Sequence, residues 1–388
     1  MSLLFFDSFD HRNSAAVGAK SNGENGALLT SAGRSGTQGA WLASSALIRN
    51  FYGAGDHATF ISGASVCFGT TGFYQQGGSL VFYSSRGSQE LWLSARAGGI
   101  LQVMRGSDDI NSVIITGTPT GPGLLSSAES SPGAIQLGVR ASVEMKATLS
   151  TYGNNTSGSL YVRVNGVVVI GLTNCKTRFT GNTTNPLTGT PYTTFDGVHW
   201  NANDGSEAFL DDWWVCNGAD SGIAGAPNND FLGDVYIKAI YPKAAGANSG
   251  LTPTPGGAHY INVNENPVAV PGTAPDLADY NESVTAEAKE TYDYDDLNLP
   301  PGAIIYGVQA VPCVSLNQAG NYGFAHLCLR GGNLREGEIV APTDVPVYFP
   351  KVYQSAPVDS PGTTFKSTNW TEAEVDASEF GIIVKALP

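Results

Sequence analysis

Hydrophobic and polar residues alternate with a period of two in many short segments of this chain. The clearest segment is AIQLGVRASVEMKATL, where every second position is apolar: Ile135, Leu137, Val139, Ala141, Val143, Met145, Ala147 and Leu149. Successive side chains of a β-strand point to opposite faces, so this pattern buries one face and leaves the other in water. On a helix the same residues would surround the axis. We therefore predict a single strand here.

Other strands are predicted on both sides of this segment, with turn residues between them. Leu91, Leu93 and Ala95 alternate ahead of Gly98-Gly99, and SLYVRVNGVVVIG contains Asn165-Gly166. Asn-Gly is a strong hairpin signal because both residues tolerate positive φ. The remaining apolar segments are FFDSF, ATFISGASVCFG, GSLVFYSS, TTFDGVHWN, AFLDDWWVC and NDFLGDVYIKAIYP. Together they predict an all-β, two-sheet antiparallel sandwich.

The chain is long enough for two domains. Residues 243–258 are rich in Gly, Ala, Thr and Pro and have no apolar periodicity, so we interpret them as a linker between domains 1–242 and 259–388. The second domain is also predicted to be a β-sandwich, with IIYGVQAVPCVSL and YGFAHLCLRGG as neighbouring strands. The acid-rich run 276–296 is predicted to be a solvated loop and strand edge, which charge protects from pairing.

Composition agrees with a β-rich protein and excludes some partners. Charged residues make up 14% of the 388 residues, and there are 48 Gly, which suits short strands joined by tight turns. The net charge of −14 argues against nucleic acid and anionic membranes. No segment approaches the roughly 18 apolar residues of a membrane span.

The cysteines and the N-terminus indicate a reducing compartment. Cys67, Cys175, Cys216, Cys313 and Cys328 are widely spaced and form no CxxC pair, so we expect small buried hydrophobic side chains rather than disulfides or zinc ligands. The first residues, MSLLFFDSFDHRN, lack the basic region and long apolar stretch of a signal peptide.

The stretch AFLDDWWVC places two acids beside two tryptophans. On a regular strand Asp211 and Trp213 share one face while Asp212 and Trp214 share the other, so the acids converge only if a bulge re-aims one of them. We interpret the tryptophans as packing residues and the acids as bonded to turn N–H groups. The alternatives are a calcium site built from Asn203, Asp204, Asp211, Asp212 and Asp220, and a sugar site in which a Trp stacks over an acid.

A second acidic motif, EVDASE, spans residues 374–379. It fits E-x-D-x-x-E, in which a strand carries the nucleophile and the acid/base of jelly-roll glucanases. Here Thr371 and Glu374 form a helix capping box, so we predict a short helix on which these acids diverge. The chain contains no nucleophile elbow, P-loop or dinucleotide fingerprint, and its five His are scattered. We therefore assign no catalytic, cofactor-binding or metal-binding residue.

Several segments resemble known proteins. The pattern SVEMKATL, SLYVRVNGVVV, FLDDWWV is similar to the concanavalin A/laminin-G class of jelly rolls. The opening LLFFDSFDH, the run FLDDWWVCNGADSGIAGAPNNDFLGDVYIKAIYP, and YINVNEN, ETYDYDDL, IYGVQAV and WTEAEVDASEFGIIV resemble structural proteins of tailed bacteriophages. The likeness implies a virion component of the tail tip, fibre, collar or capsid decoration, assembled in the bacterial cytoplasm.

These observations give a functional expectation. We predict a non-enzymatic virion protein that assembles with other virion proteins and with itself, a trimer being favoured by virion symmetry. The alternative is a lectin-like module that binds host surface glycan through the loops at one end of the sandwich, and a weaker third possibility is a glycan-cleaving enzyme. No cofactor is expected, with calcium left open.

Overall fold

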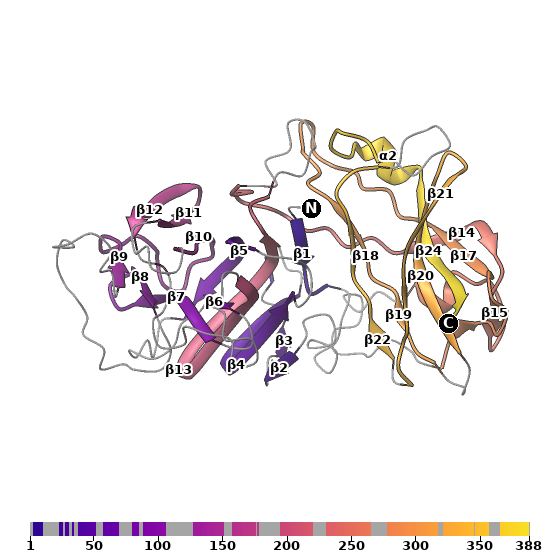
Figure 1. The fold of residues 1–388 in the computed structure, drawn as a ribbon, viewed down its shortest axis with the longest axis horizontal. Coiled ribbons are helices and arrows are strands. Elements are labelled where there is room, and N and C mark those ends of the chain that lie inside the picture. Colours follow the sequence, from indigo (N-terminus) through magenta and orange to yellow (C-terminus); the bar gives the residue numbers. More distant parts are fainter. Residues whose placement is uncertain are drawn as a thin grey trace.

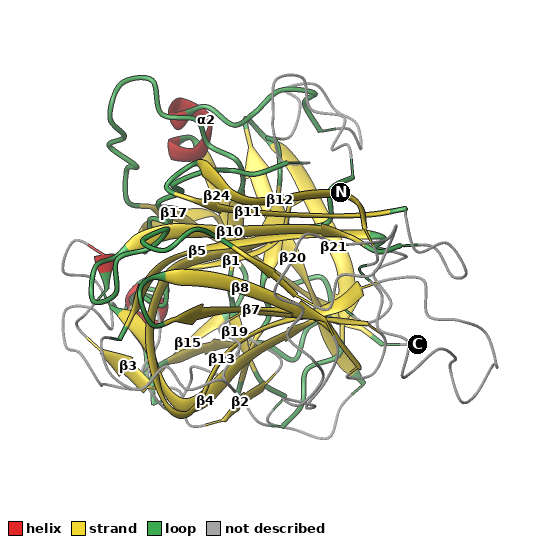
Figure 2. Cartoon of the chain, turned by 90° about the vertical axis from the view of Figure 1, so that its left-hand side faces the viewer, coloured by secondary structure: helices red, strands yellow, loops and turns green. Residues whose placement is uncertain are grey.

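The computed structural model contains almost only β-strands, as Figure 2 shows. The structure describes residues 3–10, 23–25, 28–30, 33–34, 38–51, 57–69, 80–84, 88–105, 127–150, 157–175, 177, 195–219, 230–264, 278–316, 321–344, 346–356 and 365–387. Strands β1 to β13 form the N-terminal half, and strands β14 to β24 with one short helix form the C-terminal half (Figure 1). The all-β jelly-roll prediction is confirmed.

The N-terminal strands belong to one hydrogen-bonded network. They are β1 (Leu3–Asp7), β2 (Gly23–Asn25), β3 (Leu28–Thr30), β4 (Gly39–Asn50), β5 (Thr59–Phe68), β6 (Leu80–Ser84), β7 (Ser88–Arg96), β8 (Ile100–Arg105), β9 (Ser127–Glu129), β10 (Ala141–Thr148), β11 (Gly158–Val164), β12 (Val167–Cys175) and β13 (Phe195–Cys216).

The network folds into two layers because its longest strands pass from one to the other. The register between β13 and β4 shifts between Ala202 and Glu207. Beyond this shift β13 pairs with β5 and β1, whereas before it β13 pairs with β6. We call the sheet β12-β11-β10-β5-β13 with β1, β3 and the start of β4 the first layer. The second layer is β2, the end of β4, the start of β13, and β6 to β9.

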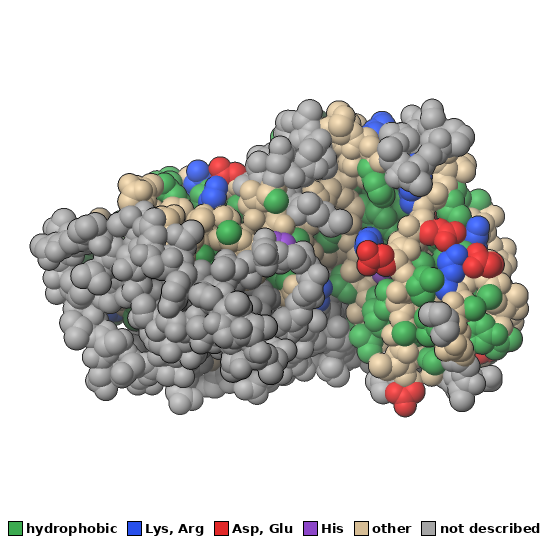
Figure 3. Space-filling model, in the orientation of Figure 1, with side chains coloured by type: hydrophobic (Ala, Val, Ile, Leu, Met, Phe, Trp, Pro, Cys, Tyr) green, Lys and Arg blue, Asp and Glu red, His purple; other side chains and the backbone are tan. Residues whose placement is uncertain are grey.

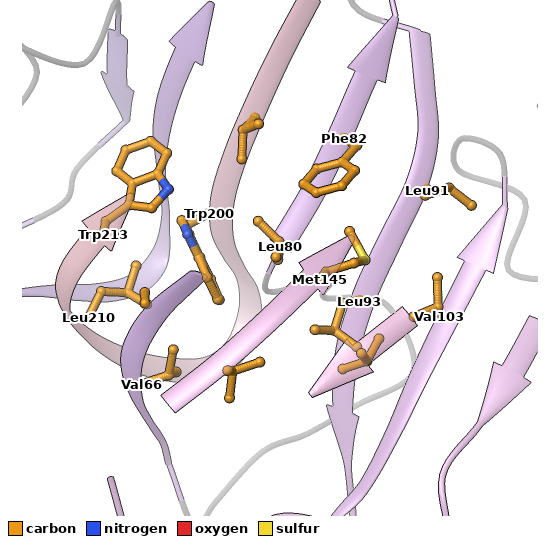
Figure 4. Close-up of a cluster of buried hydrophobic side chains, with 14 of the residues drawn as sticks. Val66, Leu80, Phe82, Leu91, Leu93, Val103, Met145, Trp200, Leu210 and Trp213 are labelled. Carbon is orange, nitrogen blue, oxygen red and sulfur yellow. The ribbon is translucent and has the colours of Figure 1, made fainter. Parts of the chain in front are cut away.

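The core lies between these layers and follows the alternation of the sequence. Leu91, Leu93 and Ala95 of β7 point inward, and Met145 of β10 faces them from the first layer (Figure 4). Trp200 and Trp213, from the two halves of β13, are fully buried in the same cluster (Figure 4). Burial of alternate positions is the main stabilisation of such a sandwich, at roughly 25 cal/mol per Å² of apolar surface.

Both predicted hairpins of this half are confirmed. Gly98 and Gly99 have positive φ in the turn between β7 and β8, and Asn165 and Gly166 have φ of 49° and 80° between β11 and β12. The predicted strand over residues 135–149 is too long, because β10 begins only at Ala141. Residues 131–140 form turns, in which Gly133 and Gly138 have positive φ.

The C-terminal half is built on a five-stranded antiparallel sheet of order β14-β17-β24-β20-β21. Its elements are β14 (Pro242–Ser249), β15 (Thr252–Thr254), the 3-10 turn η3 (Ile261–Val263), β16 (Tyr280–Glu282), β17 (Lys289–Tyr294), β18 (Val308–Ala310), β19 (Cys313–Val314), β20 (Tyr322–Arg330), β21 (Asn333–Val340), β22 (Val347–Tyr348), β23 (Lys351–Tyr353), α2 (Glu372–Asp376) and β24 (Ser378–Ala386). On the face seen in Figure 3, acidic and basic side chains of this half lie interspersed.

Three expectations for this half need correction. Residues 243–258 contain β14 and β15, and β14 pairs with β17, so this segment is not a free linker. Its small residues permit close pairing: a Cβ on Gly246 would lie 2.6 Å from the carbonyl oxygen of Thr291. The acid-rich run 276–296 contains β17, an inner strand whose Glu290 is fully buried. The segments IIYGVQAVPCVSL and YGFAHLCLRGG are predicted to be neighbouring strands. Instead the first contains β18 and β19, which pair with β23 and β22, and the second contains β20, which pairs with β24.

The two halves pack directly against each other. Strand β1 pairs with β13 on one side, and on its other side the side chain of Gln309 donates from Nε2 to the carbonyl oxygen of Phe6 (2.8 Å) and accepts from the Phe6 N–H (3.5 Å). Gln354 Nε2 donates to the carbonyl oxygen of Leu3 (3.3 Å). Side-chain amides of the C-terminal half thus cover the edge of the N-terminal sheet.

All five cysteines are free, as predicted. Cys175, Cys216 and Cys328 are buried, whereas Cys67 is half-buried and Cys313 is exposed, contrary to the expectation of burial. Among the described residues, no helix is long and apolar enough to cross a membrane.

Candidate functional site

A β-bulge interrupts β13 at the two acids singled out in the sequence. The register with β5 shifts between Asp211 and Trp214, and Asp212 has a φ of +50°. As a result Leu210 and Trp213 both face the core, and Trp214 packs on the opposite side of the sheet. The predicted packing role of both tryptophans is confirmed. The two tryptophans lie on opposite faces, as predicted, but the bulge keeps Asp211 and Asp212 together, so the acids are not divided one to a face.

The bulge brings carboxylates together. Asp10, Asp211 and Asp212 are all buried and interact electrostatically, and Arg34 Nη1 lies 3.6 Å from Asp212 Oδ2. Each carboxylate accepts a hydrogen bond from a backbone N–H group. The donors are the backbone of Gln38 to Asp10 (2.9 Å), of Arg34 to Asp211 (2.6 Å) and of Ile237 to Asp212 (2.7 Å). These bonds tie distant loops to the strand, as expected for acids bonded to turn N–H groups.

The environment raises the pKa of two of these acids. Burial, followed by repulsion from Asp211, raises the pKa of Asp10 and of Asp212 to about 7. Such values suit proton transfer. The three carboxyl groups are nevertheless buried, and each accepts from a backbone N–H. We conclude that this cluster, defined by Asp10, Asp211 and Asp212, is a structural tether.

The calcium alternative gains no support from the part of the chain that the structure describes, in which no three acidic, His or Cys side chains form a metal-binding group. Of the five residues proposed for it, Asp211 and Asp212 lie side by side. Asn203 and Asp204 lie at the bend of β13, and their side chains are outside the described part, as is Asp220.

The outer face of the first layer is covered by residues 230–237, which we call the strap. Gly233 N–H donates to the buried Glu144 of β10 (2.8 Å), and Lys146 pairs with Asp230 (3.0 Å). The guanidinium of Arg163 lies 4.0 Å from the ring centroid of Phe231. The hydroxyl of Tyr306, in the C-terminal half, donates a hydrogen bond to the carbonyl oxygen of Leu232 in the strap (3.3 Å). This face is therefore occupied by the protein itself.

The EVDASE motif does not form a site. Residues 372–376 are helical with the predicted capping box at Thr371, which confirms the predicted helix. Its acids have separate partners: Glu374 pairs with Lys366 and Arg330, Asp376 accepts from the Leu297 N–H, and Glu379 accepts from Thr291. Three carboxylates with three structural roles cannot act as one acid/base set.

The outer face of the second layer carries a different set of side chains. Because Leu91, Leu93 and Ala95 point into the core, Trp92, Ser94 and Arg96 of β7 point outward. The register pairs Trp92 with Met104 and Ser94 with Gln102 on β8, and Gln102 in turn pairs with Glu129 on β9. An aromatic ring, a hydroxyl, an amide and two charged groups therefore share one face. We call these side chains the β7–β9 face.

Hydrogen bonds order this face. Glu129 Oε1 accepts from both Arg96 Nη1 (2.8 Å) and Gln102 Nε2 (2.9 Å). The side chains of Arg96 and Glu129 are 31% and 32% exposed, whereas Ser94 and Gln102 are buried. Trp92 is also buried, and its indole N–H has no hydrogen-bond partner within the described residues. An unmet buried donor costs about 1–3 kcal/mol.

His199 of β13 lies on the same side of the second layer. Its neighbours Val198 and Trp200 belong to the core, and its register partner on β6 is Val81, which pairs in turn with Trp92. Two strand spacings place it about 10 Å from Trp92. Burial lowers the pKa of His199 to about 4, so its imidazole is neutral at physiological pH.

The sequence contained a signal for the β7–β9 face. In the hairpin QELWLSARAGGILQVMRG, the apolar positions Leu91, Leu93 and Ala95 indicate the buried face. The other half, Trp92, Ser94 and Arg96, follows the same alternation. The pairing with Glu129 comes from a segment more than 20 residues beyond the hairpin, and nothing in the local pattern indicates it.

Comparison with known proteins gives distant structural matches only. No protein-family model and no curated protein matches the sequence. A PL-14 alginate lyase from Aplysia kurodai matches with a TM-score of 0.38 and 11% identity, over 55% of this chain and 99% of that one. The alginate lyase Aly36B matches with a TM-score of 0.34 and 12% identity, over 55% and 96%. A Trypanosoma rangeli sialidase matches with a TM-score of 0.31 and 13% identity, over 49% of this chain and 27% of that one.

These matches correct the functional expectation. The structures named here are alginate lyases and a sialidase, and none of them is named as a virion protein. The prediction of a non-enzymatic virion component is thereby contradicted. At these identities and TM-scores the likeness assigns no function to this chain.

Proposed function

We propose that this protein binds a polysaccharide along the β7–β9 face. The observation that carries the proposal is the shared carboxylate oxygen of Glu129, which fixes Arg96 and Gln102 beside Trp92 and Ser94. Sugar sites combine an aromatic surface for the apolar face of a ring with a few fixed polar groups for its hydroxyls. Here the polar groups are fixed before any ligand arrives, which lowers the entropic cost of binding.

The outer face of the first layer cannot serve this purpose, because the strap covers it. On the β7–β9 face, Arg96 and Glu129 are partly exposed and give a ligand its point of entry. Trp92 is buried, so the described groups that meet a ligand at the surface are Arg96 and Glu129. The alternation of β7 and β8 thus supplies both the core on one side and the ligand face on the other.

The test is electrophoresis through gels that contain a panel of neutral and acidic polysaccharides. We expect the wild type to be retarded by at least one of them, and Gln102→Leu, which removes the amide at similar volume, to lose at least tenfold in affinity. Thr173→Ala on β12 is the control, because its exposed side chain lies on the other layer. Equal retardation of Gln102→Leu and wild type, or no retardation of the wild type in any gel, would overturn the proposal.

Cleavage of the bound polysaccharide is a second candidate function, favoured by His199. Its imidazole is neutral at pH 7 and lies on the same face as Trp92, where it can hydrogen-bond a sugar hydroxyl. Release of reducing ends from the polysaccharide that binds would support this function, together with loss of release in His199→Gln at unchanged retardation. Binding without any release would restrict the protein to recognition.

A further inference from the structure

We infer that Glu129 selects neutral polysaccharides and excludes polyuronates. This inference rests on the proposed function, and it concerns which chemical class of sugar the β7–β9 face accepts. Glu129 Oε1 accepts from Arg96 Nη1 at 2.8 Å and from Gln102 Nε2 at 2.9 Å. One carboxylate oxygen therefore binds the two donors that a ligand carboxylate would need.

The charge of the β7–β9 face also favours a neutral ligand. Among its described side chains the only cation is Arg96, and the ion pair with Glu129 compensates it. His199 on the same layer carries no charge at neutral pH. The chain as a whole has a net charge of −14. A polyuronate carries one negative charge per sugar and would meet no free cation on the described part of this face, together with an overall repulsive field.

A neutral sugar meets better-matched groups. A carboxylate offers about four acceptor positions, of which Arg96 and Gln102 use two, so Glu129 can still accept from sugar hydroxyls. The Gln102 side chain and the Trp92 N–H are buried, so the described groups that a hydroxyl meets on this face are Glu129 and Arg96. Hydroxyl groups both donate and accept, whereas an ionised uronate carboxylate can only accept.

The alternative is that the Glu129 network serves only to fasten the short strand β9 to β8. The two roles predict different consequences for Glu129→Gln. This substitution keeps the size and an acceptor oxygen but releases the charge of Arg96. If Glu129 selects the ligand, the variant exposes a free guanidinium, which is the group best suited to bind a carboxylate. If Glu129 only fastens the strand, the variant changes stability and leaves selectivity as it was.

The experiment titrates wild type, Glu129→Gln and a control with two neutral probes, hydroxyethylcellulose and xyloglucan, and with two polyuronates, alginate and polygalacturonate, at low and high salt. Glu336→Gln is the control, because Glu336 pairs with Lys385 at 2.8 Å on β21 of the C-terminal sheet and is comparably exposed. It removes the same charge at a distant surface.

We expect the wild type to bind a neutral probe at least tenfold more tightly than either polyuronate. Glu129→Gln should gain at least tenfold for polyuronate at low salt, and this gain should vanish at high salt, while Glu336→Gln should behave as wild type. A wild type that prefers polyuronate overturns the inference, as does an unchanged preference in Glu129→Gln. Both results leave polysaccharide binding intact, whereas absence of binding to all four probes at this face counts against the proposed function itself.

Discussion

The indole ring of Trp214 lies against Gly63, its register partner on β5. A Cβ added to Gly63 would lie 2.6 Å from Trp214 Cζ2, closer than any carbon contact permits. On its other side the ring belongs to a cluster with Phe231 and Leu232 of the strap. Gly63 is therefore required for the space it leaves rather than for an unusual backbone angle.

Gly63→Ala should accordingly lower the free energy of unfolding by about 3 kcal/mol, because the methyl group forces the indole from a packed position. Trp214→Leu removes the ring that is displaced. In that background the same Gly63→Ala change should cost less than about 1 kcal/mol. Urea denaturation of the four proteins measures the coupling, and additive costs would show that the contact is not the cause.

Asp212→Asn should stabilise the protein at alkaline pH. Burial and Asp211 raise the folded pKa of Asp212 to about 7, above its ordinary value of 3.8. The stability that this group contributes is complete below pH 3.8 and is lost as pH rises through about 7. An amide has no charge to lose, it can still accept from the Ile237 N–H, and Asn tolerates the positive φ at this position.

We expect Asp212→Asn to exceed the wild type by roughly 2 to 4 kcal/mol at pH 8.5, with a smaller difference at pH 5. Chemical denaturation at the two pH values checks this. Asp234→Asn is the matched control, because Asp234 also pairs with Arg34 but is exposed. A variant that is less stable than wild type at pH 8.5 would contradict the assignment of a buried repulsive cluster.

His326 should make the protein sensitive to acid. Burial, with Lys351 nearby, lowers its folded pKa from 6.5 to about 4, so its contribution to stability is lost as pH falls from 6.5 towards 4. The full loss amounts to about 3 kcal/mol. His326→Leu should flatten the decline between pH 7 and pH 4.5, as measured by thermal or urea denaturation. A slope identical to that of the wild type would show that other groups dominate the acid response.

Gln309→Ala tests the contact between the two halves. It removes both hydrogen bonds to the backbone of Phe6, so we expect a loss of about 1–2 kcal/mol. Asn321→Ala, which removes one exposed bond to Leu387 within the C-terminal half, should cost about 0.5 kcal/mol or less. Calorimetry that gives equal losses for the two variants would argue against a stabilising role for Gln309 at the junction.

The sequence predicted the features that depend on local chemistry. The alternation at Leu91, Leu93 and Ala95 identified a strand and its buried face, and Asn165-Gly166 identified a hairpin. The capping box at Thr371 identified a helix and correctly separated EVDASE from strand-borne catalytic acids. In each case the residues that determine the structure lie within a few positions of one another.

Features that depend on contacts between distant segments were not predicted from the sequence. The bulge at Asp211 and Asp212 is held by N–H groups of Arg34 and Ile237, from two segments far from the strand and from each other. Residues 243–249 have no apolar alternation, yet they pair with β17 because their small side chains fit beside it. The β7–β9 face depends on the strand register that places Glu129 beside Gln102, and no local pattern in the sequence indicates this register.

Hydrogen–deuterium exchange with and without saturating polysaccharide tests the central claim most directly, because it maps where the ligand lies. If the ligand occupies the β7–β9 face, amide protection should increase in β7, β8 and β9 and remain unchanged in β10, β11 and β12. Increased protection confined to the first layer, or to the C-terminal sheet, would contradict the account.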